Sequence, residues 1–225
     1  MRLALFDLDN TLLDGDSDHL WGEFLISQGA VDGEGHREEN DRFLREYREG
    51  RLDIDEFLRF ALRPLAEHPA ERLHAWRETF LETAIMPRIP TESLQLVDWH
   101  RAQGELPVII TATNRFVTEP IAALMGVDHL LATEPEMGPE GFTGNVTGTP
   151  CFREGKLIRL REWLGGDAAK LSEASFYSDS ANDLPLLKAV GRPVAVNPDP
   201  ELHRVARAHS WPILELRATQ VSAGE

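Results

Sequence analysis

The chain has 225 residues, of which 42% are hydrophobic, and this length suffices for an α/β core with an insertion. A formal charge of −15 argues against nucleic-acid binding, which needs a clustered basic surface, and the single cysteine, Cys151, excludes an internal disulfide. There is no apolar stretch of about 18 residues and no signal-like amino terminus, so we expect a cytoplasmic protein that does not contact membranes.

Two aspartates, Asp7 and Asp9, follow the first predicted strand, which starts at Leu3. Open α/β sheets bind ligands at the carboxyl ends of their strands, and two buried like charges need a cation or a proton to offset them. One aspartate can attack phosphorus, and another two residues on can act as a general acid and base. The pair therefore indicates phosphoryl transfer, although an isolated D-x-D can also simply end a strand.

A charged stretch with apolar residues at helical spacing runs from Asp18 to about Ala84 and predicts about four helices. The predicted breaks lie near Gly33 and Gly35, near Gly50, and over residues 64–69. The apolar residues most simply form core stripes. His19 lies close to the point where this stretch begins.

Further along, the run from Pro107 predicts a strand that ends at Thr111, whose hydroxyl and following N–H groups can hold phosphate oxygens. Lys156 opens an amphipathic helix to residue 164 and would supply positive charge. Each signal is weak alone, because such threonines usually reflect strand propensity and such lysines are usually solvated. The Gly- and Thr-rich segment 136–150 predicts a hairpin flap, with a disordered loop as the alternative.

A second buried strand, residues 174–178, precedes Asp179 and Asp183. In a parallel sheet it can neighbour the first strand, so that Asp7 and Asp179 could share a hard divalent cation. Mg2+ fits best, because it accepts a few carboxylates, a carbonyl and waters, and binds substrate phosphate. The remaining predicted elements are helices 91–103, 118–124 and 201–209, strands 194–196 and 213–216, and a frayed tail after Arg217.

Taken in order, Asp7-x-Asp9-x-Thr11, Thr111, Lys156 and Asp179-x-x-x-Asp183 resemble the motifs of the haloacid dehalogenase superfamily of phosphatases. Residues 177–186 resemble its phosphoserine phosphatase branch, subfamily IB. The resemblance implies that Asp7 is the nucleophile, that Asp9 is the acid and base, and that Thr111 and Lys156 hold the phosphoryl group. It implies Mg2+ bound by Asp7, the Asp9 carbonyl and Asp179, with Asp183 either behind these ligands or bound to the cation through water.

The resemblance also implies the fold. We expect a doubly wound, mostly parallel α/β core of residues 1–14 and 86–225, a helical cap of residues 15–85, and a small β-hairpin flap. The cap would close over the site and exclude bulk water.

Substrate choice depends on the cap. Similar phosphatases place an acid after the first motif for a substrate amine, where Asp16 falls, and a cap arginine for a substrate carboxylate, where Ala61 falls. Arg59 and Arg63 are two residues away, which is roughly 200 degrees around a helix. This favours an amine-bearing ester without a carboxylate, as in branch members that hydrolyse histidinol phosphate, with phosphoserine as the alternative. Further candidate substrate contacts are Thr11, Ala112, Asn114, Arg115 and Asn182.

Three other classes stay open. A response-regulator receiver also uses an aspartate, a threonine and a lysine, but its acidic pair and its phosphorylated aspartate lie on different strands, and it has no inserted cap. A non-catalytic binding module would keep the fold without the chemistry. A phosphomutase would return the phosphoryl group to its substrate instead of to water. The expected partner is a small phosphorylated metabolite, and the oligomeric state is open.

Overall fold

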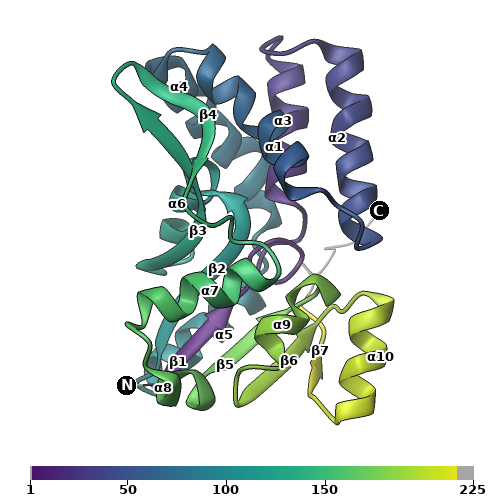
Figure 1. Ribbon diagram of the computed structural model, residues 1–225, viewed down its shortest axis with the longest axis vertical. Coiled ribbons are helices and arrows are strands. Elements are labelled where there is room, and N and C mark those ends of the chain that lie inside the picture. Colours follow the sequence, from purple (N-terminus) through teal and green to yellow (C-terminus); the bar gives the residue numbers. More distant parts are fainter. Residues whose placement is uncertain (1, 217–225) are drawn as a thin grey trace, which may run out of the picture.

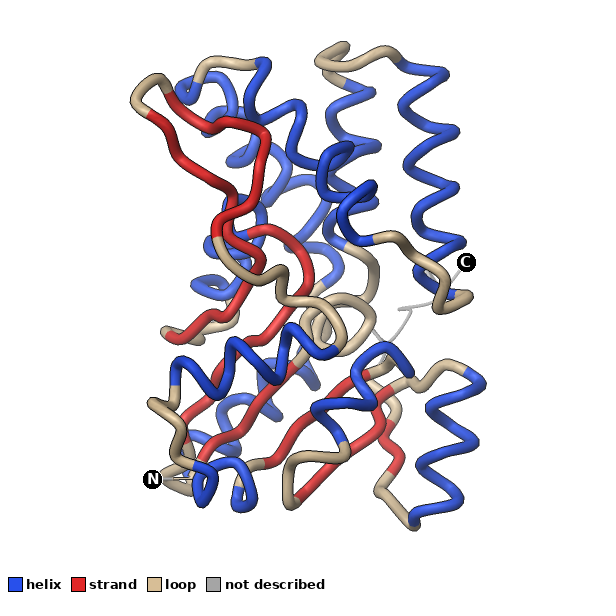
Figure 2. Tube along the Cα trace, in the orientation of Figure 1, coloured by secondary structure: helices blue, strands red, loops and turns tan. Residues whose placement is uncertain are grey.

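A seven-stranded sheet organises the chain, which the computed structural model describes over residues 2–216. The strand order is β4-β3-β2-β1-β5-β6-β7, and every neighbouring pair is parallel except β3 and β4. The mostly parallel α/β fold expected from the sequence is therefore confirmed (Figures 1 and 2). The strands are β1 (Leu3–Phe6), β2 (Leu106–Asn114), β3 (His129–Gly138), β4 (Gly141–Thr147), β5 (Ser175–Ser178), β6 (Arg192–Val196) and β7 (Ile213–Leu214).

The central strand β1 is buried on both faces, which explains its unbroken apolar sequence. Ala4 and Phe6 belong to one apolar cluster, whereas Leu3 and Leu5 belong to another, as the alternation of side chains along a strand requires. Helices α5 and α6 contribute to the first cluster, and α7 to α10 contribute to the second. The sheet is thus doubly wound. These helices are α5 (Thr91–Ala102), α6 (Arg115–Leu124), α7 (Glu154–Trp163), α8 (Ala168–Glu173), α9 (Leu184–Leu187) and α10 (Pro200–His209).

Strand register brings distant motifs to one edge. Phe6 of β1 pairs with Ile109 of β2 and with Tyr177 of β5, and the Asp7 N–H continues this ladder by donating to the Tyr177 carbonyl at 2.9 Å. The residues that follow these positions therefore meet at the carboxyl edge of the sheet, where parallel sheets place their ligands.

A second group of helices stands above this edge, in the upper half of Figure 1. Asp16, Asp32 and Asp53 begin its first three helices, because each carboxylate accepts a hydrogen bond from a backbone N–H of the first turn. The segments are α1 (Ser17–Ser27), α2 (Gly33–Arg48), α3 (Ile54–Glu67) and α4 (Ala70–Phe80), followed by a π-helical turn (Leu81–Ile85) and a 3-10 turn (Met86–Arg88).

The break predicted over residues 64–69 occurs at the end of that range, since α3 continues through Pro64 to Glu67 and the chain turns at His68. Proline removes one helical hydrogen bond, but Leu62 and Leu65 on either side are buried and anchor the helix by packing. The division into a cap of residues 15–85 and a core stays a prediction. One apolar cluster runs through both segments.

The flap is a hairpin, so the alternative of a disordered loop is wrong. Strand β3 pairs in parallel with β2 over its first half and antiparallel with β4 over its second half. β4 lies against α3, and a Cβ on Gly144 would lie only 3.4 Å from the Ala66 Cβ. The hairpin therefore rises from the sheet to contact the helical group (Figure 1).

The other predicted elements occur with shifted ends. α6 begins at Arg115, three residues earlier than predicted, and β7 is only two residues long. The predicted frayed tail after Arg217 lies outside the described residues. Within residues 2–216, no helix is long and apolar enough to cross a membrane, and the cytoplasmic location stays a prediction.

Candidate active site

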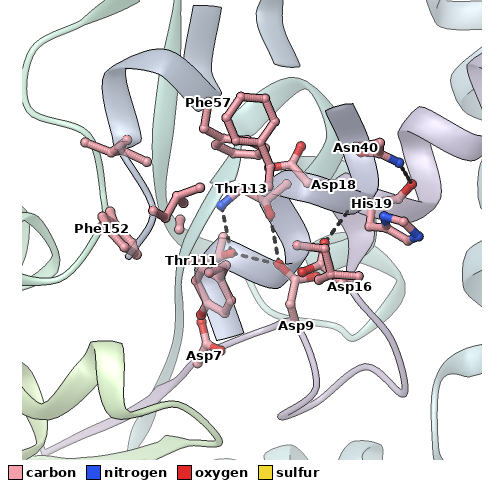
Figure 3. Close-up of a pocket in the computed structure, with 16 residues that line it drawn as sticks. Asp7, Asp9, Asp16, Asp18, His19, Asn40, Phe57, Thr111, Thr113 and Phe152 are labelled. Atoms are coloured by element: carbon pink, nitrogen blue, oxygen red, sulfur yellow. Dashed lines mark hydrogen bonds between the residues drawn. The ribbon is translucent and has the colours of Figure 1, made fainter. Parts of the chain in front are cut away.

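A pocket of about 550 Å3, including the space at its mouth, lies between the carboxyl edge of the sheet and the helical group. Its floor comes from the loop after β1 and from β2, and its walls come from α1, α2, α3 and their connections (Figure 3). The residues that line it are Asp7, Asp9, Asp16, Asp18, His19, Asn40, Phe43, Leu44, Tyr47, Leu52, Ile54, Phe57, Thr111, Ala112, Thr113 and Phe152.

Asp7 is paired with a buried lysine. The Lys156 Nζ donates to Asp7 Oδ1 at 2.7 Å and to Asp183 Oδ2 at 2.8 Å. Ser178 also donates to Asp183 Oδ2, at 2.7 Å. Burial lowers the pKa of Lys156, but the two carboxylates outweigh it and hold that pKa above its ordinary value. Lys156 is therefore a permanent positive charge beside Asp7.

Asp9 is fixed by donors from two elements. Its Oδ1 accepts from the Ser17 N–H at 2.7 Å, and its Oδ2 accepts from the Thr113 hydroxyl at 2.8 Å and from the Thr111 hydroxyl at 3.5 Å. Burial, followed by the charge of Asp16, raises the pKa of Asp9 to about 6. A carboxyl that titrates near neutral pH is suited to act as both an acid and a base.

Thr11 connects the loop after β1, which carries Asp7, with the loop after β5, which carries Asp179. Its hydroxyl lies 3.4 Å from Asp7 Oδ2 and 3.2 Å from Asp179 Oδ1, and it accepts from the Asp179 N–H at 3.0 Å. Thr11 is 1% exposed and does not line the pocket. The structure therefore does not support its expected substrate contact, because its hydroxyl is already engaged between these two aspartates.

The acidic loops suit a hard cation. Burial, with the charges of Asp7 and Asp183, raises the pKa of Asp179 well above its ordinary value, so an added positive charge is favoured there. Among residues 2–216, no group of three or more His, Cys, Asp or Glu side chains is arranged for a metal ion. The expected set needs only the side chains of Asp7 and Asp179 and the Asp9 carbonyl, because Mg2+ usually keeps waters and binds substrate phosphate. Asp183, in contrast, is held by Lys156 and Ser178.

The part of the pocket that is lined by Asp16, Asp18, Phe43 and Phe57, which we call the upper pocket, is acidic and aromatic. Asp16 accepts from the His19 N–H at 2.8 Å, and Asp18 accepts from Asn114 at 3.3 Å. Burial, then the charges of Asp16 and Asp9, raises the pKa of Asp18 well above its ordinary value. Among the described residues that line the pocket, none is lysine or arginine, and the rings of four residues complete the wall: Phe43, Tyr47, Phe57 and Phe152.

The position expected for a carboxylate-binding arginine offers no cation to this pocket. Ala61 lines a smaller cavity beside the pocket, whereas Arg59 and Arg63 line a separate groove with Phe60. The sequence-based expectation that these arginines face away from the substrate agrees with this arrangement.

Two of the three other predicted substrate contacts are engaged elsewhere. Arg115 binds Glu134 at 2.8 Å and the Leu130 carbonyl at 2.8 Å and does not line the pocket, so its substrate contact stays a prediction that this arrangement does not favour. Asn114 accepts from the Val117 N–H at the start of α6. Ala112 does line the pocket.

Asn182 and Arg153 instead connect the core with the helical group. The Asn182 amide donates to the Tyr47 carbonyl at 3.0 Å and accepts from Arg153 at 3.0 Å. Arg153 also donates to the Gly50 carbonyl at 2.6 Å. Its backbone has φ 49°, which is unfavourable for a residue with a side chain. The expected substrate contact of Asn182 is thus replaced by a contact with the α2–α3 connection.

Sequence reasoning did not identify Thr113, Asp18, Tyr47 or Arg153. The T-x-T pattern at Thr111 and Thr113 was a usable signal, because alternate strand residues face the same side. For the other three, no local pattern distinguishes them from ordinary helix and loop residues.

Comparisons with known proteins agree with this site. Residues 4–188 match the haloacid dehalogenase-like hydrolase family. The chain is 43% identical over 220 residues to a histidinol-phosphatase of Neisseria meningitidis serogroup C (strain 8013), covering 96% of this chain and 99% of that protein. It is 30% identical to phosphoserine phosphatase SerB1 of Mycobacterium tuberculosis (strain ATCC 25618 / H37Rv), covering 98% of this chain and 72% of that protein.

Solved structures share the fold. A crystal structure of a protein of unknown function from Bordetella pertussis Tohama I aligns with a TM-score of 0.89 and 45% identity, over 95% of this chain and 97% of that chain. A substrate-bound phosphoserine phosphatase aligns with a TM-score of 0.69 and 21% identity, over 96% of this chain and 94% of that chain. The chain belongs to the haloacid dehalogenase-like hydrolase family. It is a phosphatase of that family, as the motif resemblance implied.

Proposed function

We propose that the protein is a Mg2+-dependent phosphomonoester hydrolase that forms an aspartyl-phosphate on Asp7, and that histidinol phosphate is its substrate. The single observation that carries the proposal is the buried pair of Asp7 and Lys156, 2.7 Å apart, whose aspartate lines the same pocket as Asp9. An aspartate beside a fixed cation, with a second carboxyl of pKa about 6 nearby, is the equipment that two-step phosphoryl transfer requires.

In the first step, a carboxylate oxygen of Asp7 bonds to phosphorus while the ester P–O bond breaks. Asp9, protonated at the start, gives its proton to the departing alkoxide. In the second step, Asp9 takes a proton from water, the water oxygen bonds to phosphorus, and the bond between Asp7 and phosphorus breaks. Inorganic phosphate leaves, and both aspartates return to their starting states.

Charge on the transferring group is balanced by residues already in place. Lys156 and the Thr111 hydroxyl are proposed to face the phosphoryl oxygens, where fixed donors stabilise developing charge. When bound by Asp7, Asp179 and the Asp9 carbonyl, Mg2+ would supply further positive charge to the phosphate. Residues 15–85 are proposed to act as a cap that keeps bulk water from the intermediate.

The substrate is inferred from the upper pocket. Asp16 is proposed to bind a substrate ammonium, and the part of the lining that the structure describes has no arginine or lysine for a carboxylate. Aromatic walls at Phe43 and Phe57 suit a flat substrate group. The 43% identical relative is a histidinol-phosphatase, which agrees with this inference. Phosphoserine is the second candidate, because its carboxylate would have no cationic partner here, although a 30% identical relative is a phosphoserine phosphatase.

The test is phosphate release from a panel of phosphorylated metabolites with Mg2+, including histidinol phosphate, phosphoserine, sugar phosphates and nucleoside monophosphates. We expect histidinol phosphate to have the highest kcat/KM and the Asp7→Asn variant to be inactive on all of them. Release without any bisphosphate activator would exclude a phosphomutase. A preference for phosphoserine would refute the substrate, and no release from any ester would refute the phosphatase proposal.

A further inference from the structure

A small cavity, which we call the inner chamber, adjoins the pocket. Asp18, Asn40 and Phe57 line both spaces, so the inner chamber continues the upper pocket away from Asp7. In Figure 3 the Asp18 carboxyl lies near the Phe57 ring, on the far side of Thr113 and Asp9 from Asp7. A substrate that reaches Asp7 with its phosphate would therefore present its other end to Asp18.

Two buried polar groups in the inner chamber have no protein partner. Trp21 is 3% exposed and His36 is 5% exposed, and both line this space. Within the described residues, neither the indole Nε1 of Trp21 nor the Nδ1 of His36 makes a hydrogen bond. Unpaired buried polar groups are unfavourable, and they are rare in folded proteins. The indole N–H is thus available as a donor to a bound molecule.

Asp18 supplies a hydrogen-bond acceptor, whereas the indole N–H of Trp21 is a donor. Asp18 accepts from Asn114 at 3.3 Å and also bonds to the Thr113 side chain, and a carboxylate has about four lone-pair sites, which leaves capacity for a further donor. Asp16 stands two residues away, and the described lining residues include no lysine or arginine, although the charge of Arg48 acts on Asp16 from outside the lining. The upper pocket is therefore complementary to a molecule with two separate donor or cationic groups.

We propose that Asp18 is a specificity residue that binds a ring N–H of an imidazole-type group, while Asp16 binds an ammonium on the same substrate. An imidazole carries one N–H and one lone-pair nitrogen. The Asp18 carboxylate and the Trp21 N–H complement these two atoms, and Phe57 offers an apolar ring face. The inference rests on the proposed phosphatase function and extends it to the substrate's distal group.

The test compares four phosphate esters: histidinol phosphate, its analogue without the amine, its analogue without the ring, and propyl phosphate. Asp18→Asn should lower kcat/KM for the two ring-bearing esters by about 10- to 100-fold, as for loss of a charge-assisted hydrogen bond, and change the other two by less than about twofold. Trp21→Phe, which keeps the ring and removes the N–H, should also affect only the ring-bearing esters. Asp14→Asn, at an exposed acid in the loop that precedes α1, is the matched control.

Two results would overturn the proposal. If Asp18→Asn lowers kcat/KM for all four esters equally, Asp18 positions Thr113 and Asp9 and does not bind the substrate ring. If the wild-type enzyme hydrolyses all four without preference for a ring, or if Asp18→Asn changes none of them, no ring is bound there. In each case the phosphatase function survives, whereas failure to hydrolyse any ester would refute that function and this inference together.

Discussion

Lys156 and Asp7 form a 2.7 Å ion pair although 149 residues separate them along the chain. Both side chains are almost completely buried, at 2% and 4% exposed, and the same lysine holds Asp183. One ammonium therefore holds together the loop after β1 and the loop after β5. Replacing it would leave two carboxylates in an apolar environment with no counter-charge.

We predict that Lys156→Met lowers kcat at least about 100-fold and destabilises the fold by about 3 kcal/mol, because it breaks a buried ion pair. Urea unfolding and steady-state kinetics measure the two effects. Lys170→Met is the control, since Lys170 is half exposed and pairs with Asp167 at the surface. A Lys156→Met enzyme with normal kcat would show that the lysine is structural.

Asp7→Asn should leave the fold intact and abolish turnover, because the amide has nearly the same shape but cannot attack phosphorus. Residual activity should lie below about one per cent of the wild-type rate, which is about 3 kcal/mol of barrier. Circular dichroism and thermal unfolding verify the fold. Higher activity in a preparation free of wild-type enzyme would argue against a nucleophilic role.

The sequence predicts the site residues that strand pairing brings together, but not those that depend on how the helices pack. Asp7, Asp9 and Asp179 follow short apolar runs, and parallel pairing alone brings the ends of β1 and β5 together. The four helices follow from the helical spacing of their apolar residues, whereas the mostly parallel sheet was implied by the family resemblance.

The sequence could not predict which side chains form hydrogen bonds and ion pairs with each other. Arg115 stands directly after β2, the strand that carries Thr111, but its guanidinium binds Glu134 on β3, and this pairing depends on the β2–β3 register. Asp18 and Tyr47 reach the pocket only because α1 and α2 pack over the sheet edge. Pro64 is tolerated within α3 because of tertiary packing, which a local rule does not see.

Metal removal should abolish activity, and Mg2+ should restore it, whereas Ca2+ should inhibit. The two cations have equal charge, but Ca2+ adopts a larger and more variable coordination sphere and would misplace the phosphate relative to Asp7. Phosphate release after dialysis against chelator, with metal content checked by mass spectrometry, measures this. Full activity of a metal-free preparation would refute the proposed cation site.

Arg153→Ala should weaken the contact between the core and the α2–α3 connection, because the hydrogen bond to the Gly50 carbonyl is lost. We expect faster amide hydrogen exchange in residues 47–52 and a lower kcat/KM for histidinol phosphate. Arg153→Gly should show the same exchange but be more stable than the alanine variant by about 1 kcal/mol, since glycine adopts a φ of 49° without strain. Arg161→Ala, at an exposed site on α7, is the control, and unchanged exchange at residues 47–52 would contradict the contact.

His100 should make stability depend on pH. It is buried between Glu105 and Tyr177, and burial lowers its pKa despite the neighbouring carboxylate. The unfolded chain therefore binds a proton at higher pH than the folded one, so this contribution to stability is present above about pH 6.5 and is lost as the pH falls below it. His100→Gln should reduce the difference in unfolding free energy between about pH 7.5 and pH 5.5. His203→Gln, at the surface, should leave that difference unchanged, and an equal difference in wild type and His100→Gln would refute the assignment.

The most direct test of the account is to locate the phosphoryl group on the enzyme. The Asp9→Asn variant should accept the group from p-nitrophenyl phosphate, whose leaving group needs no proton, but should hydrolyse the intermediate slowly. Rapid quenching, reduction of the acyl phosphate with borohydride and peptide mapping would then identify the modified residue. The account predicts a burst of nitrophenolate and homoserine at position 7. A burst with no modification at Asp7, or with modification at another residue, would contradict it.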